Sequence, residues 1–167
     1  NTTAGASNYA QYTFTSPHGV LWDPIYNCLW AIGQTQIIKF TVGGTKTSPT
    51  LSARRISTIP GIGHDLSFVF GDENKLFFTN SGNVWKYDKV SEVSIKLPAL
   101  ANGVAVKAVS NQPMGQIVEA KTNAACSLNT WCTATVDFYD ETGGIKQTRT
   151  VTGAAFYKAD VWWYEYQ

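Results

Sequence analysis

The sequence predicts an all-β fold made of a repeated four-stranded unit. Short apolar and aromatic runs alternate with turns rich in Gly, Asn, Asp and Ser. The best candidate for a helix, residues 91–109, is interrupted by Pro98 and Gly103. The runs recur with a period of about 45 residues, which is typical of a propeller blade. We therefore expect a β-propeller, of which this chain supplies about three and a half blades.

The repeat is clearest between the segments that begin at His18 and His64. With one residue inserted, Leu29 aligns with Leu76 and Phe40 with Tyr87. Two weaker copies follow, and closed propellers need at least about four blades, so a second chain or another protomer is expected to complete the ring. The predicted partial propeller domain, 1–167, divides into blades at about 16–62, 63–104 and 105–153, closing strands at 154–167, and an outer strand of a preceding blade at 1–15.

Two stretches resemble successive blades of an uncharacterised family of secreted bacterial and fungal propeller proteins. They run from His18-Gly19-Val20-Leu21-Trp22-Asp23-Pro24 to Leu29-Trp30-Ala31-Ile32-Gly33, and from Gly63-His64-Asp65-Leu66-Ser67 to Val84-Trp85-Lys86-Tyr87-Asp88. The resemblance covers most of residues 16–160 and places the chain at the C-terminal end of that family. It implies six blades and an extracellular carbohydrate ligand, and it assigns no catalytic residue.

Composition indicates which partners to expect. The formal net charge of +1 and the absence of a long apolar run favour neither nucleic acid nor membrane. Cys126 and Cys132 flank a short loop that suits a local disulfide, with two free thiols as the alternative. Asn1 begins an Asn-Thr-Thr glycosylation sequon. Together these features predict a secreted, extracellular protein. Cys28 is either a buried thiol or the partner of a cysteine outside this chain.

The candidate catalytic residues are the two histidines, His18 and His64, which occupy the same repeat position. Lys107 and Lys158 hold that position in the weaker copies. All four would begin an innermost strand beside the propeller axis, where they would attract an anion such as a uronate carboxylate. The alternative is that a histidine after a glycine, as in Gly63-His64, packs and hydrogen-bonds within its own blade.

Further substrate-binding candidates are Asp160, Trp22 and Trp131. Asp160 shares a strand face with Lys158 and would either pair with it or join a set of channel carboxylates. The two tryptophans are candidates for stacking on a sugar ring. Asp23 is interpreted as a turn residue. No cofactor is predicted, and a calcium or zinc ion in the channel is an alternative without a ligand motif.

The leading hypothesis is a secreted propeller that binds an acidic glycan at the channel mouth and cleaves it by β-elimination at a uronate, as a polysaccharide lyase would. In that hypothesis His18 and His64 are the acid and base, while Lys107 and Lys158 bind charge. Whether the protein is an enzyme stays open. One alternative is a non-catalytic glycan-binding module. Another is an assembly protein that uses an open propeller edge to bind a partner.

Overall fold

A computed structural model describes residues 7–98, 105–123, 131–140 and 142–162 of this chain. It contains three four-stranded antiparallel sheets, each formed by four consecutive strands, and no helix in the described residues. The prediction of an all-β fold is therefore confirmed. The strands are β1 (Pro17–Asp23), β2 (Cys28–Gly33), β3 (Gln36–Gly44), β4 (Pro49–Thr58), β5 (Gly63–Phe68), β6 (Lys75–Asn80), β7 (Val84–Asp88), β8 (Ser94–Lys96), β9 (Val106–Asn111), β10 (Ile117–Lys121), β11 (Thr135–Tyr139) and β12 (Ile145–Thr150).

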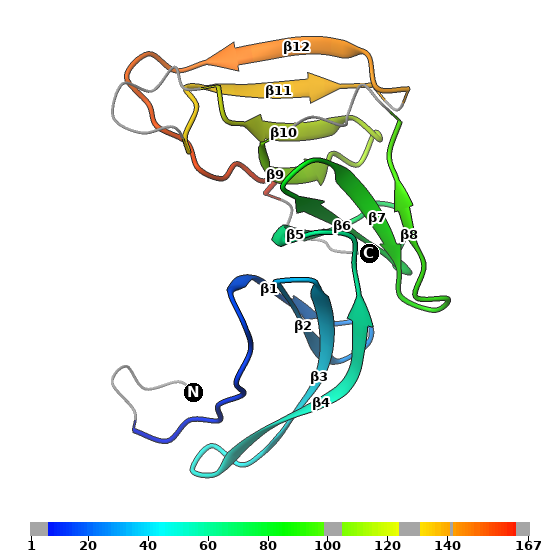
Figure 1. Cartoon of the computed structure of the whole chain (residues 1–167), viewed down its shortest axis with the longest axis vertical. Helices are drawn as coiled ribbons and strands as arrows, with labels where there is room; N and C mark the ends of the chain where they lie inside the picture. The colour runs from blue at the N-terminus through cyan, green and yellow to red at the C-terminus, as the bar shows by residue number, and fades with distance from the viewer. Residues whose placement is uncertain (1–6, 99–104, 124–130, 141, 163–167) are drawn as a thin grey trace.

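The sheets follow one another in chain order, as Figure 1 shows in blue to cyan, green, and yellow to orange. In each sheet the strands lie side by side in sequence order, so the first strand is always at one edge. The three first strands, β1, β5 and β9, lie toward the middle of the molecule, and β5 contacts both of the others. We call them the inner strands. This is a blade-like arrangement, in which neighbouring sheets share a common centre.

Apolar side chains between consecutive sheets form two separate cores. Trp30 and Ile32 of the first sheet pack against Leu76, Phe78 and Tyr87 of the second. On its other face the second sheet packs against the third through a cluster that includes Phe77, Val109 and Ile117. Side chains alternate between the two faces of a strand, so Phe77 and Phe78 face opposite neighbours. The middle sheet is thus covered on both faces.

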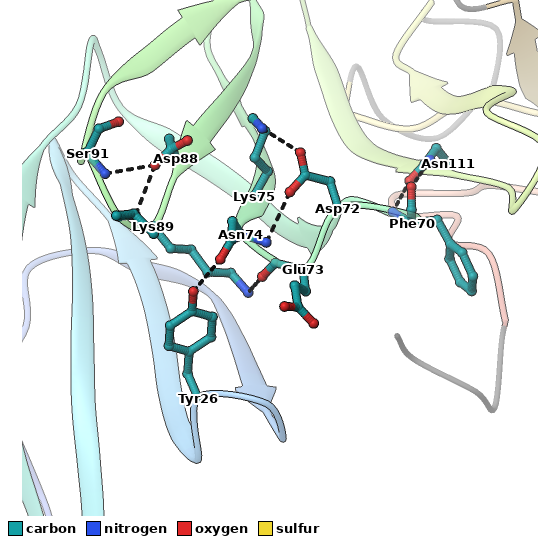
Figure 2. A network of polar contacts seen from close by, with 11 residues as sticks. Tyr26, Phe70, Asp72, Glu73, Asn74, Lys75, Asp88, Lys89, Ser91 and Asn111 are labelled. Atoms are coloured by element: carbon teal, nitrogen blue, oxygen red, sulfur yellow. Dashed lines mark hydrogen bonds and ion pairs between the residues drawn. The ribbon is translucent and has the colours of Figure 1, made fainter.

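Polar contacts join neighbouring sheets where the inner strands end (Figure 2). The Tyr26 hydroxyl donates to Asn74 Oδ1, which joins the first turn to the second sheet. The Phe70 amide donates to Asn111 Oδ1 at 2.6 Å, and Asn111 Nδ2 donates back to the Phe70 carbonyl at 3.1 Å. Each tie spans more than forty residues of sequence. The relative position of the sheets is therefore fixed by specific hydrogen bonds as well as by apolar packing.

A fully buried ion pair lies beside these ties. Asp23 and Lys89 have no exposed side-chain surface, and Lys89 Nζ lies 2.6 Å from Asp23 Oδ2. The same carboxylate accepts from Trp30 Nε1 at 3.0 Å and from the backbone amides of Ile25 and Tyr26 at 3.1 Å. Asp23 therefore has the predicted turn role and also joins the first sheet to the second.

The segments before and after the sheets form no strand in their described parts. Residues 7–15, within the range predicted as an outer strand, place Tyr12 edge-on against Phe40 with ring centroids 4.9 Å apart. Residues 154–162, within the range predicted to hold closing strands, make a single bridge from Phe156 to Thr133. A strand forms only where a neighbour completes its ladder, and neither described segment has one.

Removal of the Asp23 carboxylate tests the inter-sheet ion pair. Asp23→Ala leaves the Lys89 ammonium buried without its counter-charge, which should lower the free energy of unfolding by about 3–5 kcal/mol in urea titrations. Lys146→Ala, which breaks a surface pair with Asp140, should cost less than about 1 kcal/mol. Equal, small losses in both variants would contradict a structural role for the buried pair.

Candidate functional site

A β-bulge interrupts each inner strand at its second residue. The pairing of β1 with β2 skips His18, that of β5 with β6 skips His64, and that of β9 with β10 skips Lys107. A bulged residue leaves the regular alternation of the ladder and aims its side chain in a new direction. The same irregularity therefore presents one titratable or cationic side chain from each sheet.

The three bulged side chains meet at one end of the inner strands. The rings of His18 and His64 lie edge to face, with centroids 4.9 Å apart and planes at 89°. Lys107 Nζ lies 3.4 Å from His64 Nε2. His64 is thus in the middle of a row that begins on the first sheet and ends on the third. We call His18, His64 and Lys107 the axial row.

The glycine before His64 allows this close approach of the first two sheets. A Cβ added at Gly63 would overlap the side chain of Ile32 and come within 3.1 Å of Ile59. Both neighbours belong to the buried core between the first and second sheets. A side chain at this position would therefore push the sheets apart just where His18 and His64 meet.

The two nitrogens of His64 have unequal surroundings. Nε2 faces an ammonium, which can only donate, so this nitrogen must present its lone pair. Nδ1 then carries the proton, and it is buried without a hydrogen-bond partner among the described residues. A packing role would require a hydrogen bond within its own blade, and this ring makes none to the described residues of that blade. Buried N–H groups without a partner are rare and call for an explanation.

Burial is the main reason that the pKa of His64 is lowered, to about 4, and the charges of Lys107, His18 and Lys158 add to the effect. Burial also lowers the pKa of the Lys107 ammonium. Both shifts indicate that the surroundings of these two side chains disfavour positive charge. An anion placed beside the row would reverse that effect, because it would stabilise both cations.

His18 differs from His64 in its exposure and in which ring nitrogen makes a hydrogen bond within the protein. Its side chain is exposed, and its Nδ1 lies 2.8 Å from the carbonyl oxygen of Ser16. Because a carbonyl only accepts, Nδ1 is the donor, and Nε2 therefore presents a lone pair that can accept a hydrogen bond. Among the two histidines, His18 therefore offers the nitrogen that a ligand can reach.

Lys158 lies at the same end of the molecule but uses its donors within the protein. Nζ donates to Asp65 Oδ1 at 2.7 Å and to the carbonyl oxygens of His64 and His18 at 3.2 and 3.4 Å. The other oxygen of Asp65 accepts from the Val109 amide at 2.9 Å. Burial raises the pKa of the Asp65 carboxyl, and the Lys158 ammonium opposes that rise. Lys158 thus joins β1 to β5 at their bulges.

The pairing of Asp65 with Lys158 was not among the sequence predictions, which considered Asp160 as a partner for this lysine. Asp160 instead lines a cavity of about 130 Å³ between the inner strands, together with Leu21, Ser67 and Ser110. These last three residues each lie three positions after a member of the axial row. The cavity therefore follows the common centre of the sheets, and Asp160 faces it.

The other predicted site residues do not join the axial row. Trp22 lies near the opposite end of β1, where it pairs with Leu29. Trp131 packs edge-on against Tyr157, with ring centroids 5.7 Å apart. Cys132 is buried, whereas Cys126 and Asn1 lie outside the described residues, so the disulfide and the glycosylation site stay predictions. Cys28 is a buried free thiol.

Glu119 on β10 is a second buried titratable group that sequence reasoning missed. It is 1% exposed, and its Oε1 has no hydrogen-bond partner among the described residues. Burial raises its pKa to about 8, and nearby Asp137 adds to this effect. Glu119 pairs with Val109, which belongs to the core between the second and third sheets. A mostly neutral acid therefore lies within that interface at neutral pH.

Within the described ranges, no cluster of three or more His, Cys, Asp or Glu side chains is arranged to hold a metal ion. The same part of the chain contains no helix that is long and apolar enough to cross a membrane.

The fold and the axial row define an all-β protein of stacked four-stranded sheets with a cationic cluster at its centre. The chain belongs to the family of unknown function DUF6528, whose family model matches residues 8–161. This membership agrees with the predicted resemblance to an uncharacterised family. No curated protein matches the chain.

The lowered pKa of His64 makes stability depend on pH. The unfolded chain binds this proton near pH 6.5 and the folded chain near pH 4, so the free energy of unfolding should fall as pH decreases through that window. His64→Gln should remove this part of the pH dependence, on the order of 1 kcal/mol after allowance for solvent screening. Urea titrations across the window measure it.

The matched control is Lys96→Met, a change at an exposed position of β8. This variant should keep the pH dependence of the unmodified protein. If His64→Gln also keeps it, His64 is not held neutral by its surroundings, and the assignment of its two nitrogens is wrong.

Proposed function

We propose that this protein is part of a secreted β-propeller that binds an acidic carbohydrate at the axial row. The observation that carries the proposal is the position of His64 between His18 and Lys107, with Nδ1 buried and unpartnered among the described residues. Three sheets each contribute one bulged side chain to this point. A cluster that disfavours its own positive charge is suited to an anionic ligand.

The charge balance around the axial row favours a ligand that brings one carboxylate. Lys158 is neutralised by Asp65, and its donors are occupied. Lys107 makes no salt bridge to a described residue, so it is the cation that is free to meet a ligand. A carboxylate beside Lys107 and His64 would pair with the ammonium and favour protonation of His64. A uronate residue supplies such a group on a sugar ring.

The ring completed by further blades is part of the same proposal. The inner strands share a centre, and the cavity that Asp160 faces lies between them. In closed propellers such a centre is lined by the innermost strand of each blade. The axial row then lies at one mouth of a channel, where an extended polysaccharide can approach from outside.

A binding experiment tests this function. Polygalacturonate oligomers are titrated into the protein by calorimetry, with a neutral galactan as the matched ligand. Lys107→Met should weaken binding of the acidic oligomer by about 10-fold or more, because a charge-assisted hydrogen bond is lost. Lys96→Met should bind like the unmodified protein, and affinity should rise as pH falls below neutral, since the bound carboxylate favours protonated His64.

Equal binding of the neutral galactan would contradict a site for anions. Full binding by Lys107→Met would place the ligand elsewhere on the molecule.

A second candidate function, cleavage by β-elimination, is supported by the orientation of His18. Its Nδ1 donates to a carbonyl and its Nε2 is free, as a general base requires. In this reaction His18 takes the C5 proton of a uronate, and that electron pair forms the C4=C5 double bond. The C4–O bond breaks, and the leaving oxygen takes a proton from water. Lys107 stabilises the negative charge that develops on the carboxylate.

The unsaturated product of β-elimination absorbs in the ultraviolet, so a continuous assay detects it. We expect the signal with polygalacturonate to be lost in His18→Gln, while affinity for the oligomer changes little. Lys107→Met should lose affinity as well as rate. Binding without any unsaturated product in the unmodified protein would favour the non-catalytic glycan-binding module.

A further inference from the structure

A cavity of about 370 Å³ lies between the second and third sheets. Val69, which follows β5, and Asn111, the last residue of β9, both line it. The axial row lies at the other end of the inner strands, where they begin. This cavity is therefore separate from the candidate site, and its volume is within the range of small-molecule sites, about 300–1,000 Å³. We call it the inter-sheet cavity.

The inter-sheet cavity has apolar walls and one cation. Phe77, Leu97 and Ile117 line it and belong to the buried core between the two sheets. Lys86 lines it from β7, where it pairs with Phe77 across the strands. The Lys86 ammonium lies 5.3 Å from the centroid of the Phe77 ring. A ligand in this cavity would meet an aromatic ring and a positive charge side by side.

The Lys86 ammonium has no counter-charge within the described part of the chain. It is partly buried and makes no salt bridge to a described residue. The cavity lining also includes Asp72, but its carboxylate is paired with Lys75 (Figure 2). The charge that the cavity leaves unmatched is therefore positive.

The equivalent space between the first and second sheets is filled by a tyrosine ring. The repeat places Lys39 where Lys86 lies, and each pairs with an aromatic residue of the preceding strand. The Lys39 ammonium lies 4.8 Å from the centroid of the Tyr26 ring. The Tyr26 hydroxyl donates to Asn74 Oδ1 on the second sheet. The first interface thus holds an aromatic ring with a polar tip beside its lysine.

Two differences in the repeat leave this space open between the second and third sheets. The residue that corresponds to Tyr26 is Glu73, since each comes just before the aligned asparagine of its turn. Glu73 is exposed and does not line the cavity. In the third sheet, Gly115 takes the position of Asn74, two residues before the residue that pairs with the end of the inner strand. Both the ring and its polar partner are therefore replaced.

We propose that the inter-sheet cavity binds a small aromatic carboxylate. The ring of the ligand would pack against Phe77 and Ile117, and its carboxylate would pair with Lys86. The ring that Tyr26 places in the equivalent space favours an aromatic ligand, and the unmatched ammonium favours an anion. A charge-assisted hydrogen bond is about twice as strong as a neutral one, so the carboxylate would supply much of the affinity. This site is independent of the proposed carbohydrate site.

Titration of the isotope-labelled protein with phenylpropionate, followed by NMR chemical shifts, tests the proposal. We expect saturable binding, with the largest shifts at the amides of the glycines in the lining, Gly71, Gly115 and Gly143. Lys86→Met should weaken binding by about 10-fold or more, because the charge-assisted contact is lost. Lys86→Arg keeps the charge and should retain most of the affinity. Lys96→Met, at an exposed position of the same sheet, should bind like the unmodified protein.

Two matched ligands separate the ring from the charge in the unmodified protein. Phenylpropionamide lacks the charge and hexanoate lacks the ring, so both should bind more weakly than phenylpropionate. Equal binding of either one would overturn the proposal. Full affinity in Lys86→Met, or affinity that is lost in Lys107→Met instead, would place the ligand outside the inter-sheet cavity and also overturn it. Lys86→Met should leave binding of polygalacturonate unchanged, so failure of one site can be told apart from failure of the other.

Discussion

The β-bulge at the second residue of each inner strand is the constraint on which the candidate site depends. In a regular ladder, successive side chains alternate between the two faces of a sheet. The bulges release His18, His64 and Lys107 from that alternation, so that side chains from three sheets meet. Close approach of the sheets at Gly63 brings the two histidine rings together. Repeated backbone irregularity thus builds a polar cluster on an apolar scaffold.

The axial row and Lys158 together contain more basic than acidic groups. Among the basic groups, Lys158 is paired with a carboxylate, that of Asp65. Lys158 is held by Asp65 and by two backbone carbonyls, which stabilise the bulged strands. Lys107 and His64 form no such pair with a described carboxylate, and burial is the main cause of the lowered pKa of each. An anion bound beside these two groups would stabilise the charged form of each. This is the physical basis for proposing a ligand here.

Much of the fold could be predicted because it is local. Alternating runs and turns identify β-structure, and the repeat aligns His18 with His64 at the start of equivalent strands. The bulges could not be predicted, since they depend on the pairing register. The Asp65–Lys158 and Asp23–Lys89 pairs were missed because they join residues far apart in sequence. Their partners become evident only once the sheets are packed.

The protonation state of His64 tests the central claim most directly. Long-range nitrogen–proton NMR spectra distinguish the two neutral tautomers of a histidine from the charged form. At neutral pH we expect His64 to be neutral with its proton on Nδ1, and galacturonate to shift it toward the charged form. A charged ring in the free protein, a proton on Nε2, or resonances that galacturonate does not change would contradict an anion site built around this histidine.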